Sequence, residues 1–249
     1  MAPDSAPVPL RYRGVWQRTL LEAPAVRDTT TTVLWMQTGH WHADLRIGAG
    51  RPDFSGVGSL AACDAEQLAW LSSQQGFAGI TTVDITSGQE ICAWHRLVDV
   101  QPPGLTADAG VMVFTPECLI ETGVHGPYLE HWIALPGSRG GSAAYRCAQD
   151  QDRLQLLLVT GQQVMRVHDR RCAWPSGLSA GTSLAQLLAD LPLAQQRSLL
   201  DIEISFGSRT GRGWQIRHST LPWLEGNEVT LAIDDMDPSW QELEPHRAA

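Results

Sequence analysis

Lysine is missing from this chain of 249 residues, whose 18 basic residues are all arginine. Lysine supplies the amine of a Schiff base, the anchor of pyridoxal phosphate and the cation of a P-loop, so these chemistries are excluded. The net charge of −9, from 27 acidic and 18 basic residues, argues against a nucleic-acid partner, because phosphate contacts need clustered positive charge.

Cysteine is also scarce, and its spacing fits neither a disulfide framework nor a zinc finger. The residues at 63, 92, 118, 147 and 172 form no Cys-x-x-Cys pair, which indicates buried thiols in a reducing compartment. The first ten residues lack the cationic start and apolar core of a signal peptide, and no apolar run has the length of a membrane span. We therefore expect a cytoplasmic protein with no membrane partner, and its oligomeric state is left open.

Short alternating segments separated by glycine, proline and aspartate fill the chain and predict a mainly β protein. About eight strands are predicted between Tyr12 and Leu135, the number whose barrel interior holds side chains or one small ligand. Residues 136–142 are rich in Gly, Ser and Pro and predict a boundary. Residues 1–10 are proline-rich and are expected to be loose. The half beyond the boundary brings few titratable residues together and is predicted to be structural.

Two short helices are predicted among the strands. The first runs from about Cys63 to Gln75, where Asp64 and Gln67 have the spacing of a capping pair. The second runs from about Ser183 to Leu191 and is interrupted by Pro192. In a barrel protein, the first would be a lid or a side-packing helix.

Gly14-Val15-Trp16 resembles the Gly-x-Trp that begins the first strand of lipocalin and calycin barrels, where the Trp closes one end of the barrel beneath an Arg from a late strand. With the similar Gly213-Trp214 near the chain end, the layout is similar to a family of fungal kinase-interacting proteins built from two lipocalin-like barrels. The resemblance implies two consecutive antiparallel lipocalin-like β-barrels or half-barrels, at 11–136 and 143–249. It also implies a ligand cavity, without identifying the ligand.

The segment 39–47 sorts its side chains into two unlike faces when it is placed on a strand. One face would carry His40, His42, Asp44 and Arg46, and the other the apolar residues Trp41, Ala43, Leu45 and Ile47. A polar strand face is either a solvated surface or the lining of a polar cavity. We expect the second, with a pocket in the first barrel.

Arginine is the only residue of this chain that can clamp a carboxylate through a planar fork. The alternative is that the arginines pair with acidic residues of the chain itself, namely Asp44, Asp99, Glu121 and Glu130. Tryptophans on the predicted strands would wall the pocket. The favoured function is binding of a small, mainly apolar or aromatic molecule with an acidic or polar end. The predicted ligand-binding residues are Trp16, Arg18, Asp44, Arg46, Arg51, His95, Tyr128 and Glu130.

Two other classes of function remain. A metal-independent isomerase, lyase or hydrolase would use His40, His42, Glu121 and His125 for acid–base chemistry in the same pocket, since glycine turns around His125 can place it at the barrel mouth. The His-x-His spacing also suits a metal, but Asp44 and Arg46 follow where a cupin pattern has Glu, so no metal or other cofactor is expected. Thirdly, an interaction protein would dock a partner through the second half or an exposed sheet edge.

Overall fold

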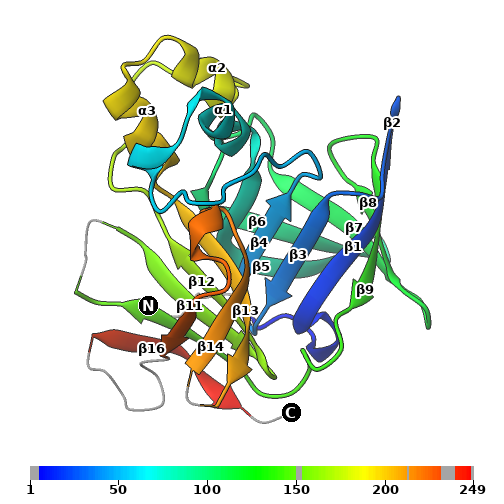
Figure 1. Ribbon diagram of the computed structural model, residues 1–249. Coiled ribbons are helices and arrows are strands. Elements are labelled where there is room, and N and C mark those ends of the chain that lie inside the picture. Colours follow the sequence, from blue (N-terminus) through cyan, green and yellow to red (C-terminus); the bar gives the residue numbers. More distant parts are fainter. Residues whose placement is uncertain (1–5, 150–152, 212, 231–238, 248–249) are drawn as a thin grey trace.

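The computed structural model describes residues 6–149, 153–211, 213–230 and 239–247. Two antiparallel sheets follow one another along the chain, with three short α-helices at one end of the molecule (Figure 1). The prediction of a mainly β protein with two consecutive antiparallel barrels or half-barrels is confirmed, as one closed barrel followed by a second sheet. None of the helices in the described ranges has both the length and the apolar character needed to cross a bilayer.

The first sheet closes into an eight-stranded barrel because its first strand pairs with both β3 and β9. Strand β2 extends the barrel as the outer arm of a hairpin with β1. The strands are β1 (Gly14–Ala23), β2 (Val26–Asp28), β3 (Thr32–Gln37), β4 (Trp41–Ile47), β5 (Gln75–Thr86), β6 (Gln89–Asp99), β7 (Asp108–Phe114), β8 (Leu119–Gly123) and β9 (Leu129–Ala134).

The second sheet has the order β15-β14-β13-β12-β11-β10-β16. Its strands are β10 (Ser142–Cys147), β11 (Gln155–Thr160), β12 (Gln163–His168), β13 (Glu203–Thr210), β14 (Gly213–Ser219), β15 (Glu228–Thr230) and β16 (Trp240–Arg247). The first six correspond to strands that the alternation of the sequence predicts at 144–148, 154–160, 163–169, 200–206, 213–219 and 227–234. Part of the last segment lies outside the described residues. Strand β16 was not predicted from the sequence. It returns to pair with β10 and so becomes one edge of this sheet.

The helices form where the sequence supplies their caps. In α1 (Ala65–Ser73), Asp64 and Gln67 make the predicted capping box, and Ser183 makes the same box with Gln186 in α2 (Leu184–Ala189). Pro192 ends this helical run and caps a further helix, α3 (Leu193–Leu200), which the sequence analysis missed. Short 3-10 turns complete the set: η1 (Leu10–Tyr12), η2 (Leu60–Ala62) and η3 (Pro222–Leu224).

One apolar core lies between the outer wall of the barrel and the second sheet. The apolar face of β4 belongs to it, as do Leu156, Leu158 and Ile204 of the second sheet. The alternation predicted for β4 is therefore confirmed from Trp41 onward, since Trp41, Ala43, Leu45 and Ile47 all enter this core. The opposite face of β4 consequently points into the barrel.

The N-terminal segment closes one end of the barrel. Val8 is 2% exposed and its amide donates to the carbonyl of Gly39 at 2.7 Å, so the segment that was predicted to be loose is anchored to the barrel at Val8. Trp16 lies beside this plug and donates to the carbonyl of Tyr12. The guanidinium of Arg139, which follows β9, lies 5.4 Å from the Trp16 ring. Trp16 is therefore buried at this end of the barrel, and the arginine beside it comes from the connection between β9 and β10 and not from a late strand.

Candidate functional site

A cavity of about 230 Å³ occupies the barrel interior, and each of the eight barrel strands contributes to its lining. Aromatic rings form much of the wall, and carboxyl and guanidinium groups stand between them. The lining consists of Leu21, Trp35, Asp44, Arg46, Phe77, Trp94, Arg96, Asp108, Glu121, Tyr128, Glu130 and Trp132.

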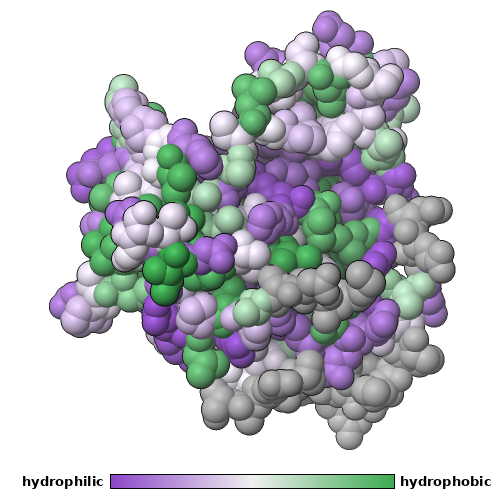
Figure 2. Space-filling view, turned by 180° about the vertical axis from the view of Figure 1, so that it is seen from behind, coloured by the Kyte–Doolittle hydropathy of each residue, from purple (hydrophilic) through white to green (hydrophobic). Residues whose placement is uncertain are grey.

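Two outer grooves adjoin this cavity. The space-filling view is hollowed between the helices and the projecting β1–β2 hairpin (Figure 2), and a groove lies there between Val26 of β2 and Trp70 of α1. Arg46 lines both this groove and the barrel cavity. A cleft of about 720 Å³ lies on another side, and it shares Arg96 and Tyr128 with the cavity. The side chains of Arg46, Arg96 and Tyr128 therefore lie between the barrel interior and the outer grooves.

Two β-bulges decide which charged groups point inward. Between Arg18 and Leu20 the register of β1 on β9 shifts by one residue, so Arg18 and Leu21 both lie toward the interior despite their odd spacing. In β6 the register on β5 shifts at Leu97, and Arg96 and Asp99 consequently form an ion pair at 2.8 Å. Uniform alternation along the segment 90–100 puts Arg96 and Asp99 on opposite faces. That expectation from the sequence is wrong, because the bulge at Leu97 interrupts the alternation.

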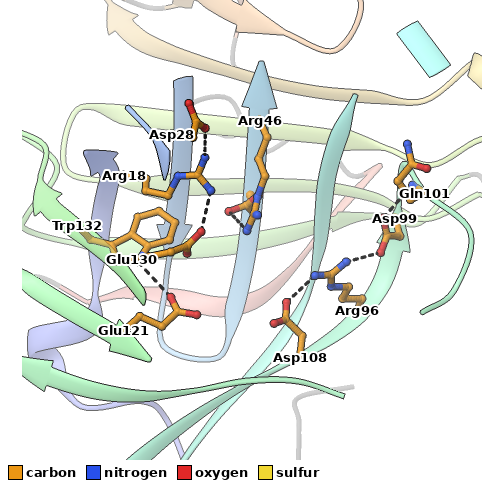
Figure 3. Close-up of polar contacts among 11 residues, drawn as sticks. Arg18, Asp28, Arg46, Arg96, Asp99, Gln101, Asp108, Glu121, Glu130 and Trp132 are labelled. Carbon is orange, nitrogen blue, oxygen red and sulfur yellow. Dashed lines mark hydrogen bonds and ion pairs between the residues drawn. The ribbon is translucent and has the colours of Figure 1, made fainter. Parts of the chain in front are cut away.

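Every arginine beside the cavity is held by carboxylates of the chain (Figure 3). Arg46 donates to both oxygens of Asp44, at 2.6 and 3.4 Å. The ion pairs of Arg18 join Glu130 and Asp28, each at 2.7 Å, and those of Arg96 join Asp99 and Asp108 at 2.8 and 2.6 Å. The alternative weighed from the sequence, that these arginines form internal ion pairs, is the arrangement observed.

Glu121 is the exception among the acidic groups of the cavity. Its carboxyl group is 3% exposed and accepts hydrogen bonds from two uncharged donors, the Tyr128 hydroxyl at 2.8 Å and the Trp132 indole N–H at 3.1 Å. Burial, and then the nearby carboxylate of Glu130, raise the pKa of Glu121 to about 8. Glu121 therefore holds a proton at neutral pH when the cavity is empty.

Two glycines make room for this arrangement. A Cβ atom on Gly110 would lie 2.6 Å from Cγ of Glu121, and one on Gly123 would lie 2.4 Å from the ring of Tyr128. Both distances are far inside van der Waals contact. The positions of the Glu121 carboxyl group and the Tyr128 ring thus depend on glycine in β7 and β8.

The predicted ligand-binding residues divide into two groups. Asp44, Arg46, Tyr128 and Glu130 line the cavity, together with Glu121. The others lie elsewhere: Trp16 packs at the closed end, Arg18 is engaged in its two ion pairs, Arg51 binds Glu225 at 2.9 Å, and His95 contacts Thr82 beside the outer cleft.

The predicted catalytic histidines are not brought together. His40 precedes β4 and its Nδ1 lies 2.9 Å from Glu244 of β16, so it does not share a face with His42. His42 is buried against Phe77 and contacts the hydroxyl of Thr81 at 3.0 Å, while burial lowers its pKa to about 3. His125 lies in the outer cleft. Of the four candidates only Glu121 reaches the cavity.

Sequence reasoning missed three lining residues, namely Leu21, Phe77 and Asp108. Phe77 stacks between two guanidinium groups, with Arg46 at 5.4 Å and Arg96 at 3.7 Å from its ring centre. Asp108 is the first residue of β7, and because aspartate is typical of turns, its residue type did not indicate a position in the cavity. In the described part of the chain, no three His, Cys, Asp or Glu side chains are grouped closely enough to hold a metal ion.

Comparisons with known proteins inform the fold alone. The sequence matches no protein-family model and no curated protein. The structure is similar to the crystal structure of an uncharacterized protein of Saccharomyces cerevisiae, YLR301w, with a TM-score of 0.53 and 12% sequence identity. The match covers 83% of this chain and 84% of the yeast chain. At this identity the likeness supports a common architecture and carries no information on activity.

Proposed function

We propose that the first barrel binds a small molecule, with a mainly apolar or aromatic body and one polar end, in the cavity around Glu121. The cavity itself supports this, because eight strands enclose about 230 Å³ between aromatic walls instead of filling it with side chains. An apolar cavity of about 150 Å³ holds one benzene-sized molecule. A single ring with a short polar substituent therefore suits the space.

Features outside the cavity agree with a lipocalin-like use of the barrel. Trp16 and the N-terminal plug close one end of the barrel. At the other end, Arg46 and Leu21 line both the cavity and the outer groove. The five cysteines are free thiols, which supports our proposal of a cytoplasmic, reducing location. An acidic end on the ligand has less support, since the arginines that would grip it are already paired with carboxylates.

Ligand titration combined with a change in cavity volume tests this function. We expect neutral single-ring compounds such as 2-phenylethanol to quench tryptophan fluorescence and raise the Tm, because Trp35, Trp94 and Trp132 line the space. Leu21→Phe fills the cavity and should weaken binding at least tenfold. Leu193→Phe, the same substitution at an exposed position of α3, should leave binding unchanged. The proposal fails if no single-ring compound with one polar end binds, whatever its charge, or if the two variants behave alike.

Acid–base catalysis is the second candidate, and one observation favours it. Glu121 is a protonated carboxyl group at neutral pH, hydrogen-bonded to Tyr128 inside a cavity, which is the state required of a general acid. The separate environments of His40, His42 and His125 count against the fuller catalytic set predicted from the sequence. A metal-independent lyase or hydrolase would have to rely on Glu121, with turnover abolished in Glu121→Gln.

A further inference from the structure

We infer that the ligand of the barrel carries an organic ammonium group, which pairs with Glu121 while its ring or chain lies against the tryptophan walls. This inference rests on the proposed binding function and adds the chemical class of the ligand. It departs from the acidic end expected from the sequence.

The charge balance of the cavity is the first argument. The cavity lining and its ion-pair partners hold six carboxyl groups against three guanidinium groups. Each guanidinium already donates to one or two of these carboxylates. An incoming carboxylate would therefore enter an excess of negative charge, whereas a cation would reduce it. The six acidic residues are Asp28, Asp44, Asp99, Asp108, Glu121 and Glu130.

The position of Glu121 is the second argument. The other five acidic groups bind arginine, but the partners of Glu121 are the uncharged hydroxyl of Tyr128 and the indole of Trp132. A carboxylate oxygen accepts more than one hydrogen bond, so both donors can stay in place when an ammonium group arrives. Glu121 thus has the chemistry of an acceptor for a cation that comes from outside the chain.

The walls distinguish an organic cation from a metal ion. Trp35, Trp94 and Trp132 line the same cavity as the Glu121 carboxyl group, and aromatic rings attract ammonium groups. Grouped carboxylates at ligand distance would be needed for a metal, and no set of three ligating side chains forms in the described ranges. A single-ring amine such as 2-phenylethylamine matches both the walls and the volume of about 230 Å³.

Binding of this cation is linked to a proton. The groups that face Glu121 are Glu130 and Asp108, which favour its protonated form, and Arg46 and the Tyr128 hydroxyl, which favour the carboxylate. A bound ammonium group would also favour the carboxylate form of Glu121, as Arg46 and the Tyr128 hydroxyl do. Below the pKa of the empty site, the ammonium ion displaces the Glu121 proton, which leaves to solvent, and the amine keeps its own.

Three ligands of one shape test the inference: 2-phenylethylamine, 2-phenylethanol and phenylacetate, titrated at pH 7 with tryptophan emission excited at 295 nm. We expect the amine to bind at least tenfold more tightly than the alcohol, equivalent to about 1.4 kcal/mol, and the acid to bind more weakly than both. Calorimetry in phosphate and in Tris should show net proton release with the amine alone. If the alcohol or the acid binds as tightly as the amine, the ammonium inference is overturned while small-molecule binding stands. If none of the three binds, both proposals fail.

A matched pair of variants assigns the preference to one carboxyl group. Glu121→Gln should reduce the ratio of amine to alcohol affinity to near one. Glu117→Gln, an exposed glutamate in the β7–β8 turn with the same change in charge, should retain the wild-type ratio. A Glu121→Gln protein that is folded by circular dichroism and still prefers the amine would overturn the inference. The three-ligand comparison on the unmodified chain decides the question even where this variant fails to fold.

Discussion

Glu121 of β8 and Glu130 of β9 are directly opposite one another in the antiparallel register, and both are nearly fully buried. Like charges at directly opposed positions destabilise a sheet. The two carboxyl groups avoid this repulsion because their partners differ. Glu130 is held by Arg18 at 2.7 Å, and Glu121 takes neutral donors and a raised pKa.

Replacement of Glu121 by glutamine should change how stability depends on pH. The folded state keeps a proton on Glu121 that the unfolded chain releases near pH 4.5, so this group lowers the free energy of unfolding as the pH rises from about 4.5 to about 8. Glu121→Gln should therefore be more stable than wild type by about 1–3 kcal/mol at pH 8 and nearly equal at pH 4. Urea unfolding at both pH values measures the difference. Glu117→Gln should show no such crossover.

Loss of Arg18 should be costly because it leaves two acidic groups without their partner. Arg18→Leu removes the ion pairs to Glu130 and Asp28, and we expect a loss of about 3 kcal/mol in the free energy of unfolding. The double variant Arg18→Leu/Glu130→Gln should recover part of it. Arg27→Leu, which breaks an exposed pair with Glu22, should cost less than about 0.5 kcal/mol. Equal losses in the two arginine variants would refute a structural role for the Arg18 pairs.

His42 should make the protein sensitive to acid. The hydroxyl of Thr81 donates to Gln37 and so accepts from Nδ1–H of His42, which leaves the ring neutral, with its pKa lowered to about 3. In the unfolded chain His42 binds a proton below about pH 6.5, whereas in the folded protein it stays neutral until the pH approaches 3. His42 therefore lowers the free energy of unfolding as the pH falls from 6.5 toward 3. His42→Gln should flatten that part of the stability profile. His125→Gln, the same substitution at an exposed histidine of the outer cleft, is the matched control and should leave the slope as it is.

Gly110 should tolerate no side chain while Glu121 keeps its place. A Cβ there meets Cγ of Glu121 at 2.6 Å, so Gly110→Ala should destabilise the barrel by about 1–3 kcal/mol, as overpacking does. Gly58→Ala, where a Cβ meets open space, is the matched control. Adding Glu121→Ala to Gly110→Ala should remove the clash. Thermal unfolding of the four proteins measures the coupling, and additive losses would contradict the contact.

The sequence predicted those features of the fold that follow from regular periods and from local chemistry. The apolar face of β4, the capping box at Asp64 and the helix that begins after Ser183 are of this kind. It did not predict the bulges near Arg18 and Leu97, which depend on the partner strand and which set the inward charges. The role of Glu244 could not be predicted either, because its hydrogen bonds to Gly39 and His40 join residues more than 200 positions apart in the sequence. Asp44 and Arg46 follow the regular alternation of β4 and were placed on the correct face, whereas the position of His40 depends on Glu244 and was predicted wrongly.

The shared core backs only part of the barrel wall. Strands β3, β4 and β5 bury their outer faces against the second sheet, whereas β7 and β9 expose Val113 and Ile133 on theirs. The strands that carry Asp108, Glu121 and Glu130 therefore lie on the less supported side. Local opening is easiest where few apolar contacts hold an element. Amide hydrogens of β7–β9 should therefore exchange with deuterium faster than those of β3–β5, because local opening begins on the side of the barrel that carries the acidic groups.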